Sequence, residues 1–153
     1  MVRRGLWLIA VLTVVSICAT WWVHNRSPRR NVLLITLDTT RADRLGCYRH
    51  EGALTPVIDR LAQRGVVFER AYAPVPLTLP SHASMLTGLY PPEHGLHNNG
   101  QGALPHELPT LATTLQSNGY DTGAFVAAFV LEKKFGLDRG FGTYDDDLSE
   151  VPE

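Results

Sequence analysis

Residues 31–37 read NVLLITL, and Asp38 follows them directly. This short, almost wholly apolar run predicts a strand that is buried on both faces of a parallel sheet. Asp38 is the first carboxylate after the run, so it is expected at the carboxyl edge of the strand. Ligands bind at that edge in open α/β sheets. Asp38 is therefore a candidate ligand for a divalent cation, and the alternative is an ordinary turn or N-cap aspartate.

Helix and strand signals alternate along the rest of the chain. Thr55 and Pro56 predict the start of a helix that ends at Gly65. Further helices are expected over residues 81–86, with Gly88 as the stop, and from Leu108-Pro109 to Gly119. Further strands are expected over residues 66–68 and 122–129, and loops over residues 73–80 and 89–105. This alternation predicts a three-layer α/β fold with a mainly parallel sheet.

The amino-terminal region has a different character. Residues 5–23 carry no charge and are mostly apolar. A helix of that length is about 28 Å long, close to the thickness of the bilayer core. We therefore expect one transmembrane helix, with residues 1–30 as anchor and linker and residues 31–153 as the globular part. A cleaved signal peptide is the alternative, and the bulky Trp21 and Trp22 at the expected cleavage region favour a retained anchor.

Charge and cysteine content exclude several classes. Beyond residue 31 the chain has fifteen acidic residues against nine basic ones, a net charge of −6, which excludes a nucleic-acid partner. Cys18 lies in the apolar run, which leaves Cys47 without an intramolecular partner, so no disulfide framework is expected. Three consecutive aspartates, residues 145–147, are expected to form a solvated acidic turn, with a metal site as the alternative.

A second candidate site residue is Thr78 in the segment TLPSH. It is expected in a loop just ahead of a helix start, where unpaired backbone N–H groups favour an anion. A hydroxyl there can attack a bound phosphate or sulfate ester, provided that a metal ion lowers its pKa. The alternative is a helix-capping threonine.

Four segments taken together resemble the N-terminal part of the sulfatase family, in the alkaline phosphatase superfamily. They are NVLLITLDTTRADRLGCY, TPVIDRLAQRGVVFERAYA, LPSHASMLTGLYPPEHG and LPTLATTLQSNGYDT. The resemblance implies an alkaline-phosphatase-like sandwich of which this chain holds the N-terminal portion. It also implies that residues 31–153 are part of a catalytic domain and that Thr78 stands at the position of the nucleophile.

The chain departs from the sulfatase pattern at several positions. Thr78 replaces the Cys or Ser that is oxidised to formylglycine, and His82 replaces the arginine that would hold it. By spacing, the family's lysine and histidine of the Gly-Lys-x-His segment fall on Ala127 and Phe129. Thr39 replaces a second metal-binding aspartate and is at best a weak ligand. These departures argue against formylglycine chemistry.

The departures are similar to the pattern of the nucleotide pyrophosphatase/phosphodiesterases of the same superfamily. That branch uses a threonine nucleophile in Thr-x-Pro-x-His, followed by Thr-Gly-Leu-Tyr-Pro and His-Gly. This sequence has TLPSH from Thr78, TGLYP from Thr87, and then His94-Gly95. The resemblance implies that Asn99 donates a hydrogen bond to a phosphoryl oxygen. The alternative for Asn99 is a turn residue, and His94 is expected to fix the loop.

These observations and the resemblance predict a membrane-anchored, metal-dependent hydrolase of sulfate or phosphate esters. Basic residues flank both ends of the apolar run and leave its orientation open, with a lean toward an internal globular part. The resemblance implies a globular part outside the cytoplasm. Substrates are expected among small-molecule, glycan or lipid esters. The metal, calcium or else zinc or manganese, would bind Asp38 and Thr78, with its other ligands from the second half of the family fold. We expect the chain to be a partial or truncated product that is inactive alone. The alternative is a non-catalytic membrane protein or binding module.

Overall fold

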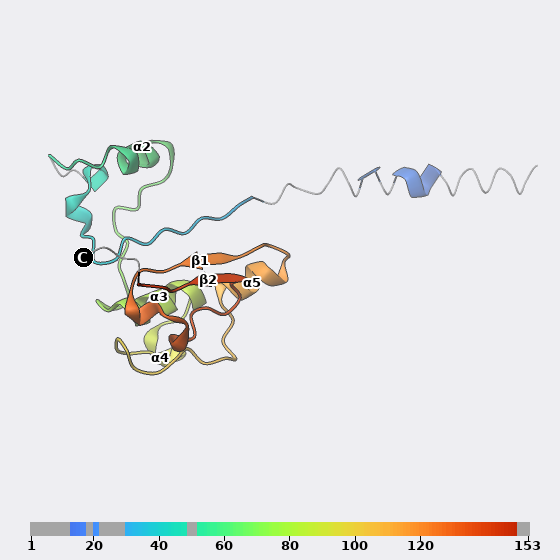
Figure 1. Cartoon of the computed structure of the whole chain (residues 1–153). Coiled ribbons are helices and arrows are strands. Elements are labelled where there is room, and N and C mark those ends of the chain that lie inside the picture. Colours follow the sequence, from blue (N-terminus) through green and yellow to red (C-terminus); the bar gives the residue numbers. More distant parts are fainter. Residues whose placement is uncertain (1–12, 18–19, 22–29, 49–51, 150–153) are drawn as a thin grey trace, which may run out of the picture. The chain divides into compact units, whose positions relative to one another are not determined.

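A computed structural model describes residues 13–17, 20–21, 30–48 and 52–149 (Figure 1). The chain divides into two compact units, residues 1–37 and residues 38–153, which we describe separately. All the labelled helices and strands belong to the second unit.

The first unit is helical over residues 13–17 and 20–21, where the Thr20 hydroxyl donates to the Ser16 carbonyl oxygen at 2.9 Å. Within the stretches that the structure describes, no helix is long and apolar enough to cross a membrane. Most of the predicted membrane helix over residues 5–23 lies outside the described residues.

The strand predicted over residues 31–37 is not present in the structure. These residues form neither helix nor strand, and their side chains are exposed, Leu33 to 83%. A strand is stable when a neighbouring strand satisfies its backbone groups. An apolar run supplies the side chains for burial but cannot supply that neighbour, so the prediction was wrong at this point.

The second unit begins with two 3-10 turns, η1 (Ala42–Arg44) and η2 (Gly46–Tyr48), followed by helix α2 (Pro56–Arg64). The predicted limits of α2 are confirmed, with Pro56 in its first turn and Gly65 at its C-cap. The Thr55 hydroxyl accepts a hydrogen bond from the Gly46 N–H at 2.9 Å and donates to Asp59 Oδ1 at 3.1 Å. Thr55 therefore joins η2 to α2 instead of capping its own helix.

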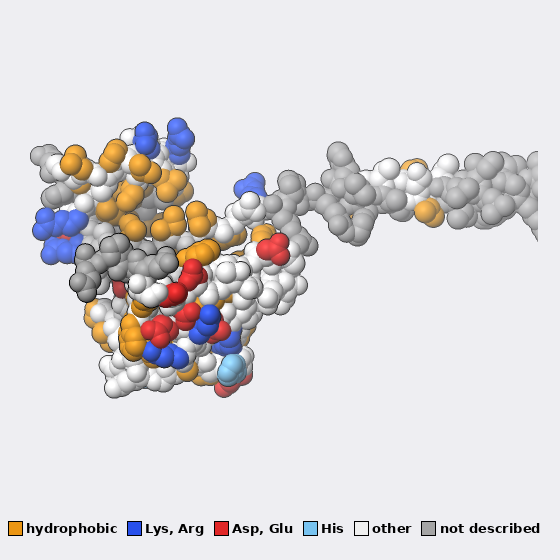
Figure 2. All heavy atoms as spheres, in the orientation of Figure 1, with side chains coloured by type: hydrophobic (Ala, Val, Ile, Leu, Met, Phe, Trp, Pro, Cys, Tyr) orange, Lys and Arg blue, Asp and Glu red, His pale blue; other side chains and the backbone are white. Residues whose placement is uncertain are grey.

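Apolar side chains are exposed on α2 and on the segment after it. Val57 is 68% exposed and Leu61 is 69% exposed. Residues 66–68, predicted as a strand, have no regular secondary structure and are exposed as well, again because no partner strand pairs with them. Figure 2 shows apolar side chains gathered over α2.

Three further helices are α3 (Thr78–Thr87), α4 (Pro91–His94) and α5 (Leu111–Ser117). Helix α3 begins at Thr78, three residues before the predicted start, and ends at Gly88 as predicted. Gly88 has the left-handed φ of 74° that favours glycine at a helix end. Helix α4 lies inside the predicted loop of residues 89–105, where Pro91 starts the helix and Gly95 stops it.

The sheet consists of two parallel strands, β1 (Gly123–Phe125) and β2 (Thr143–Asp145). An α/β fold with a parallel sheet is therefore confirmed. Strand β1 is shorter than the predicted strand over residues 122–129. Strand β2 was missed, because its last residue, Asp145, is the first of the three aspartates that we expected to form a solvated turn. Asp146, just after β2, accepts the Lys133 backbone N–H at 2.9 Å.

The core forms around α3. Leu79 and Ala83 of this helix are completely buried, and they pack in one cluster with Leu131, Phe135 and Leu137. Partly buried side chains extend the cluster toward the sheet and the neighbouring loops: Leu86, Leu108, Val126, Ala128 and Val130. Burial of a leucine of this kind contributes about 2 kcal/mol. This cluster holds α3, and with it Thr78, against the rest of the unit.

The turn before β2 packs closely on the start of α5. Thr110, the N-cap of α5, donates its hydroxyl proton to the Arg139 carbonyl oxygen at 3.0 Å. Gly140 has a φ of +86°, and a Cβ atom at this position would lie 2.1 Å from the Thr113 nitrogen. Only glycine fits there, both for its backbone conformation and for the space.

We expect Gly140→Ala to lower the free energy of unfolding by about 3 kcal/mol or more, because the methyl group displaces the α5 backbone. Gly100→Ala is the matched control, since Gly100 also has a positive φ but a Cβ there meets nothing within 4 Å. It should cost only about 1 kcal/mol. Urea denaturation of both variants checks this, and equal costs would contradict the packing explanation.

Candidate active site

The structure brings Asp38 and Thr78 together. The Thr78 hydroxyl donates a hydrogen bond to Asp38 Oδ2 at 3.0 Å, although the two residues are 40 positions apart in the chain. Asp38 is exposed and Thr78 is half-buried, so a ligand can reach both side chains. These are the two residues that the sequence singled out for metal binding and nucleophilic attack.

The turn that carries Asp38 is strained. Thr39 has a φ of +55°, a left-handed conformation that β-branched residues rarely adopt. Its backbone N–H donates to Asp38 Oδ1 at 3.0 Å, so one carboxylate oxygen binds the turn and the other binds Thr78. Strain of this kind costs about 1–3 kcal/mol and persists where the surrounding structure imposes it, commonly at functional sites.

Thr78 is the first residue of α3 and not a loop residue ahead of it, as the sequence had suggested. The backbone N–H groups that follow it are largely occupied. The Leu79 N–H donates to Asn99 Oδ1 at 2.9 Å, and the Ser81 N–H donates to the Leu77 carbonyl oxygen at 3.1 Å. Pro80 between them has no N–H. Among the described residues the Thr78 N–H has no hydrogen-bond partner, so an anion beside Thr78 could bind this N–H, side-chain donors and the positive end of the helix dipole.

Asn99 is one such donor. Its amide oxygen is held by the Leu79 N–H, in the residue next to Thr78, while the Asn99 side chain remains exposed. Because the oxygen points to the helix, the amide NH2 group is the part that is available to a ligand. The structure thus brings together Asp38, Thr78 and Asn99, the three residues that sequence reasoning proposed. The hydrogen bond to Leu79 was not predicted, and no local pattern signals it.

The two histidines of the motif have structural contacts. His82 Nδ1 donates to the Thr78 carbonyl oxygen at 2.8 Å, one helical turn back. His94 is completely buried, with Nδ1 accepting the Leu96 N–H at 3.2 Å and Nε2 lying 3.0 Å from Ser84 Oγ. Burial lowers the pKa of His94, and this outweighs the opposing effects of the backbone of His94 itself and of the Pro80 carbonyl group. The contacts agree with the expectation that His94 fixes its loop.

The candidate metal ligands are oxygen donors, as a hard cation prefers, but they are too few to hold one. Asp38 and Thr78 each offer an oxygen, and hard divalent cations take about six oxygen ligands. In the part of the chain that the structure describes, no group of three or more His, Cys, Asp or Glu residues could hold a metal ion. Any cation at Asp38 therefore needs further donors beyond these two side chains.

The positions of the missing sulfatase lysine and histidine lie after β1. Phe129 is 55% exposed and begins the 3-10 turn η3 (Phe129–Leu131), which packs on α3. The Lys134 ammonium group lies 3.7 Å from the centre of the Phe129 ring and also pairs with Glu132 at 2.7 Å. An aromatic ring covered by a lysine thus stands where the family pattern has a histidine.

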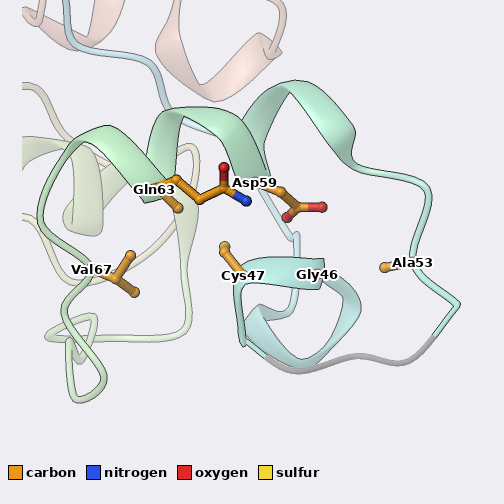
Figure 3. Close-up of a pocket in the computed structure, with 7 residues that line it drawn as sticks. Gly46, Cys47, Ala53, Asp59, Gln63 and Val67 are labelled. Atoms are coloured by element: carbon orange, nitrogen blue, oxygen red, sulfur yellow. The ribbon is translucent and has the colours of Figure 1, made fainter.

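A separate hollow of about 540 Å³ lies between η2 and α2, lined by Gly46, Cys47, Ala53, Asp59, Ala62, Gln63 and Val67 (Figure 3). Figure 3 shows the Cys47 side chain pointing toward α2. Cys47 forms no disulfide among the described residues. The hollow includes none of the three proposed site residues, so it is not the candidate active site.

Comparison with known sequences identifies one family. The family profile described as Sulfatase matches residues 30–149. Human arylsulfatase A is 40% identical over 98 residues, which cover 61% of this chain and 19% of the human protein. Rat steryl-sulfatase is 40% identical over 106 residues, covering 63% of this chain and 18% of the rat protein. The chain therefore spans about a fifth of the length of these relatives.

Solved structures give the same result. The phosphonate monoester hydrolase of Agrobacterium radiobacter superposes with a TM-score of 0.65 and 34% identity, over 75% of this chain and 25% of that protein. A 2-O GAG sulfatase superposes with a TM-score of 0.60 and 27% identity, over 72% of this chain and 24% of that protein. Both solved structures thus match about three quarters of this chain.

We expect the free energy of unfolding to fall as the pH is lowered through 6.5, the ordinary pKa of histidine. Folded His94 binds its proton less readily than unfolded His94, so the unfolded state takes up more protons in this range. The loss should level off below the folded pKa. Urea denaturation between about pH 8 and about pH 5 measures it.

His94→Asn should reduce this pH dependence, whereas His106→Gln, at an exposed histidine, should leave it unchanged. A pH dependence that is the same in His94→Asn and in the parent protein would show that His94 does not cause it.

Proposed function

The chain belongs to the sulfatase family, and on this premise we propose that it supplies the nucleophile side of the active site in a hydrolase of sulfate or phosphate esters. The nucleophile is Thr78. The observation that supports this proposal is the hydrogen bond from the Thr78 hydroxyl to Asp38, with Asn99 held beside the same helix end.

In the first step, the Thr78 oxygen forms a bond to the phosphorus or sulfur atom as the bond from that atom to the ester oxygen breaks. The departing alcohol oxygen takes a proton from water. The Thr78 proton already points at Asp38 Oδ2, which accepts it, and the lone pairs of the Thr78 oxygen face away from Asp38. In the second step, water attacks the same phosphorus or sulfur atom, and the bond from that atom to the Thr78 oxygen breaks. The proton held by Asp38 returns to the Thr78 oxygen, and the proton lost by the attacking water neutralises the hydroxide formed in the first step.

Negative charge on the transferred group is stabilised by the Asn99 amide. A hydrogen-bond donor that is already oriented toward developing charge lowers the barrier without reorganisation in the transition state. The bond from the Leu79 N–H to Asn99 Oδ1 provides that orientation. The positive end of the ten-residue helix α3 adds a favourable field at Thr78.

A divalent cation, calcium or else zinc or manganese, would lower the pKa of the Thr78 hydroxyl when bound. Asp38 and Thr78 would be two of its ligands. Family members supply the other ligands from later parts of their chains, and we propose that the same holds for this protein.

Both ester classes fit the relatives. A phosphonate monoester hydrolase and sulfatases are among the similar proteins. Replacement of the formylglycine precursor by Thr78 favours phosphate or phosphonate esters over sulfate esters, because threonine cannot form the aldehyde hydrate that sulfatases use. Small-molecule, glycan and lipid esters are all compatible with an exposed site.

The wider setting is part of the same proposal. Residues 1–30 would form a membrane anchor and linker, and residues 31–153 would be part of a three-layer catalytic domain outside the cytoplasm. The uncharged, apolar run over residues 5–23 supports the anchor. A non-catalytic role as a membrane-bound binding module is the second candidate, favoured by the small number of cation ligands in the described residues.

Thr78→Ala should abolish covalent labelling of the protein by a 32P-labelled phosphate ester, because the attacking oxygen is removed. The full-length protein that the gene encodes is labelled and digested, and the modified residue is identified by mass spectrometry. Thr87→Ala is the matched control, since Thr87 is at the opposite end of the same helix, and it should keep the label. Labelling that persists in Thr78→Ala would exclude Thr78 as nucleophile.

Asn99→Ala should lower kcat about 10²-fold with a smaller change in KM, because it removes a donor that acts mainly on the transition state. Steady-state hydrolysis of aryl phosphate and aryl sulfate esters provides the measurement. Asn98→Ala is the control, because the Asn98 side chain is exposed, donates to the neighbouring Gln101 Oε1 at 3.3 Å and should tolerate the change. An unchanged kcat in Asn99→Ala would leave Asn99 as a structural cap of α3.

A further inference from the structure

We propose that His94 is a positioning residue for the candidate active site: it locks residues 94–99 onto α3 and so places the Asn99 amide beside Thr78. The inference rests on the proposed roles of Thr78 and Asn99. It concerns the placement of the amide, which can be measured without any hydrolysis.

His94 connects two parts of the second unit through its ring. Nε2 lies 3.0 Å from the hydroxyl oxygen of Ser84, in the middle of α3, and Nδ1 accepts the N–H of Leu96 at 3.2 Å. The ring has no exposed surface. Both ring nitrogens are thus engaged inside the protein, as a buried polar group requires.

These contacts fix the protonation of the ring. A backbone N–H can only donate, so Nδ1 carries no proton when it accepts from Leu96. The proton of the neutral ring is therefore on Nε2, which donates to Ser84 Oγ. The fall in the pKa of His94 on burial supports the neutral state. The neutral His94 ring thus accepts the loop N–H of Leu96 with one nitrogen and donates to the helix hydroxyl of Ser84 with the other.

Residues 94–99 are attached to α3 at both ends. His94 binds Ser84 at one end, and Asn99 binds the Leu79 N–H at the other end. Between them, Leu96 is 2% exposed and packs in the core cluster with Leu79. The segment therefore runs along α3 from its middle to its first turn, which begins at Thr78.

Chain length alone does not place Asn99. The distance along α3 from Ser84 to Leu79 is about 7.5 Å at the helical rise per residue. Residues 94–99 can span about 17 Å when extended. The segment therefore has more than twice the length that it needs, and Asn99 could occupy many positions if the His94 end were free. The two bonds of the His94 ring, together with the burial of Leu96, remove that freedom.

Hydrogen exchange of the Leu79 amide measures the placement directly, because Asn99 Oδ1 is its acceptor. We expect His94→Asn to lower the protection of the Leu79 amide at least tenfold. Asparagine can still accept the Leu96 N–H in a local turn, but it is too short to reach Ser84. Asn99→Ala removes the acceptor itself and so gives the protection of the Leu79 amide when this hydrogen bond is completely lost. The Gly88 amide, which donates to the Ser84 carbonyl oxygen at 2.8 Å, reports whether the helix itself is intact.

Ser84→Ala tests the same link from the helix side, with a smaller disturbance of the core. It should lower the protection of Leu79 as well, while Ser84→Thr, which keeps the hydroxyl, should retain it. The double variant His94→Asn/Ser84→Ala should be no worse than His94→Asn alone, because both changes break one contact.

Two outcomes overturn the inference. In one, the Leu79 amide keeps its protection in folded His94→Asn or Ser84→Ala protein. In the other, the amides of Leu79 and Gly88 lose protection to the same extent, which shows that His94 only stabilises the helix.

The result is separable from the proposed function. If Leu79 responds as expected but Asn99→Ala hydrolyses esters normally, the positioning holds and the proposed role of Asn99 fails. If both hold, Ser84→Ala should lower kcat more than it changes KM, and Ser84→Thr should restore kcat.

Discussion

Burial of one face of α3 holds the second unit together. Leu79 and Ala83 have no exposed surface, and the segments around residues 96, 104, 131 and 135 pack onto them. Because the helix is rigid, fixing this face also fixes the direction of its first turn and the position of Thr78. The candidate active site therefore depends on apolar contacts that lie one residue away from the Thr78 hydroxyl.

Hydrogen bonds between distant parts of the chain complete the site. Asp38 reaches Thr78 from a strained turn, and Asn99 reaches the next N–H of the helix from a loop. Each of these bonds contributes only about 1 kcal/mol, so the apolar core, and not the polar contacts, must provide the stability. The polar contacts instead decide which atoms face a ligand: one carboxylate oxygen, one hydroxyl and one amide NH2 group.

Similarity to known hydrolases and the residues that differ from the sulfatase pattern together indicate the type of group that the site could transfer. The sulfatase profile matches residues 30–149, and a phosphonate monoester hydrolase matches 75% of the chain. Thr78, His82 and Phe129 differ from the sulfatase pattern at positions tied to sulfate chemistry. A threonine beside a carboxylate and an amide donor is suited to transfer of a phosphoryl or sulfuryl group through the hydroxyl itself.

The sequence by itself determined the features that depend on neighbouring residues: the limits of α2, the stop of α3 at Gly88, and the family with its candidate site residues. Proline and glycine act on the local backbone, so these signals can be recognised without the fold. Strands at residues 31–37 and 66–68 were predicted wrongly and β2 was missed, because strand pairing requires a partner far along the chain. Only the tertiary structure decided that the Leu79 N–H binds Asn99 and that Thr78 meets Asp38, since those partners are 20 and 40 residues away.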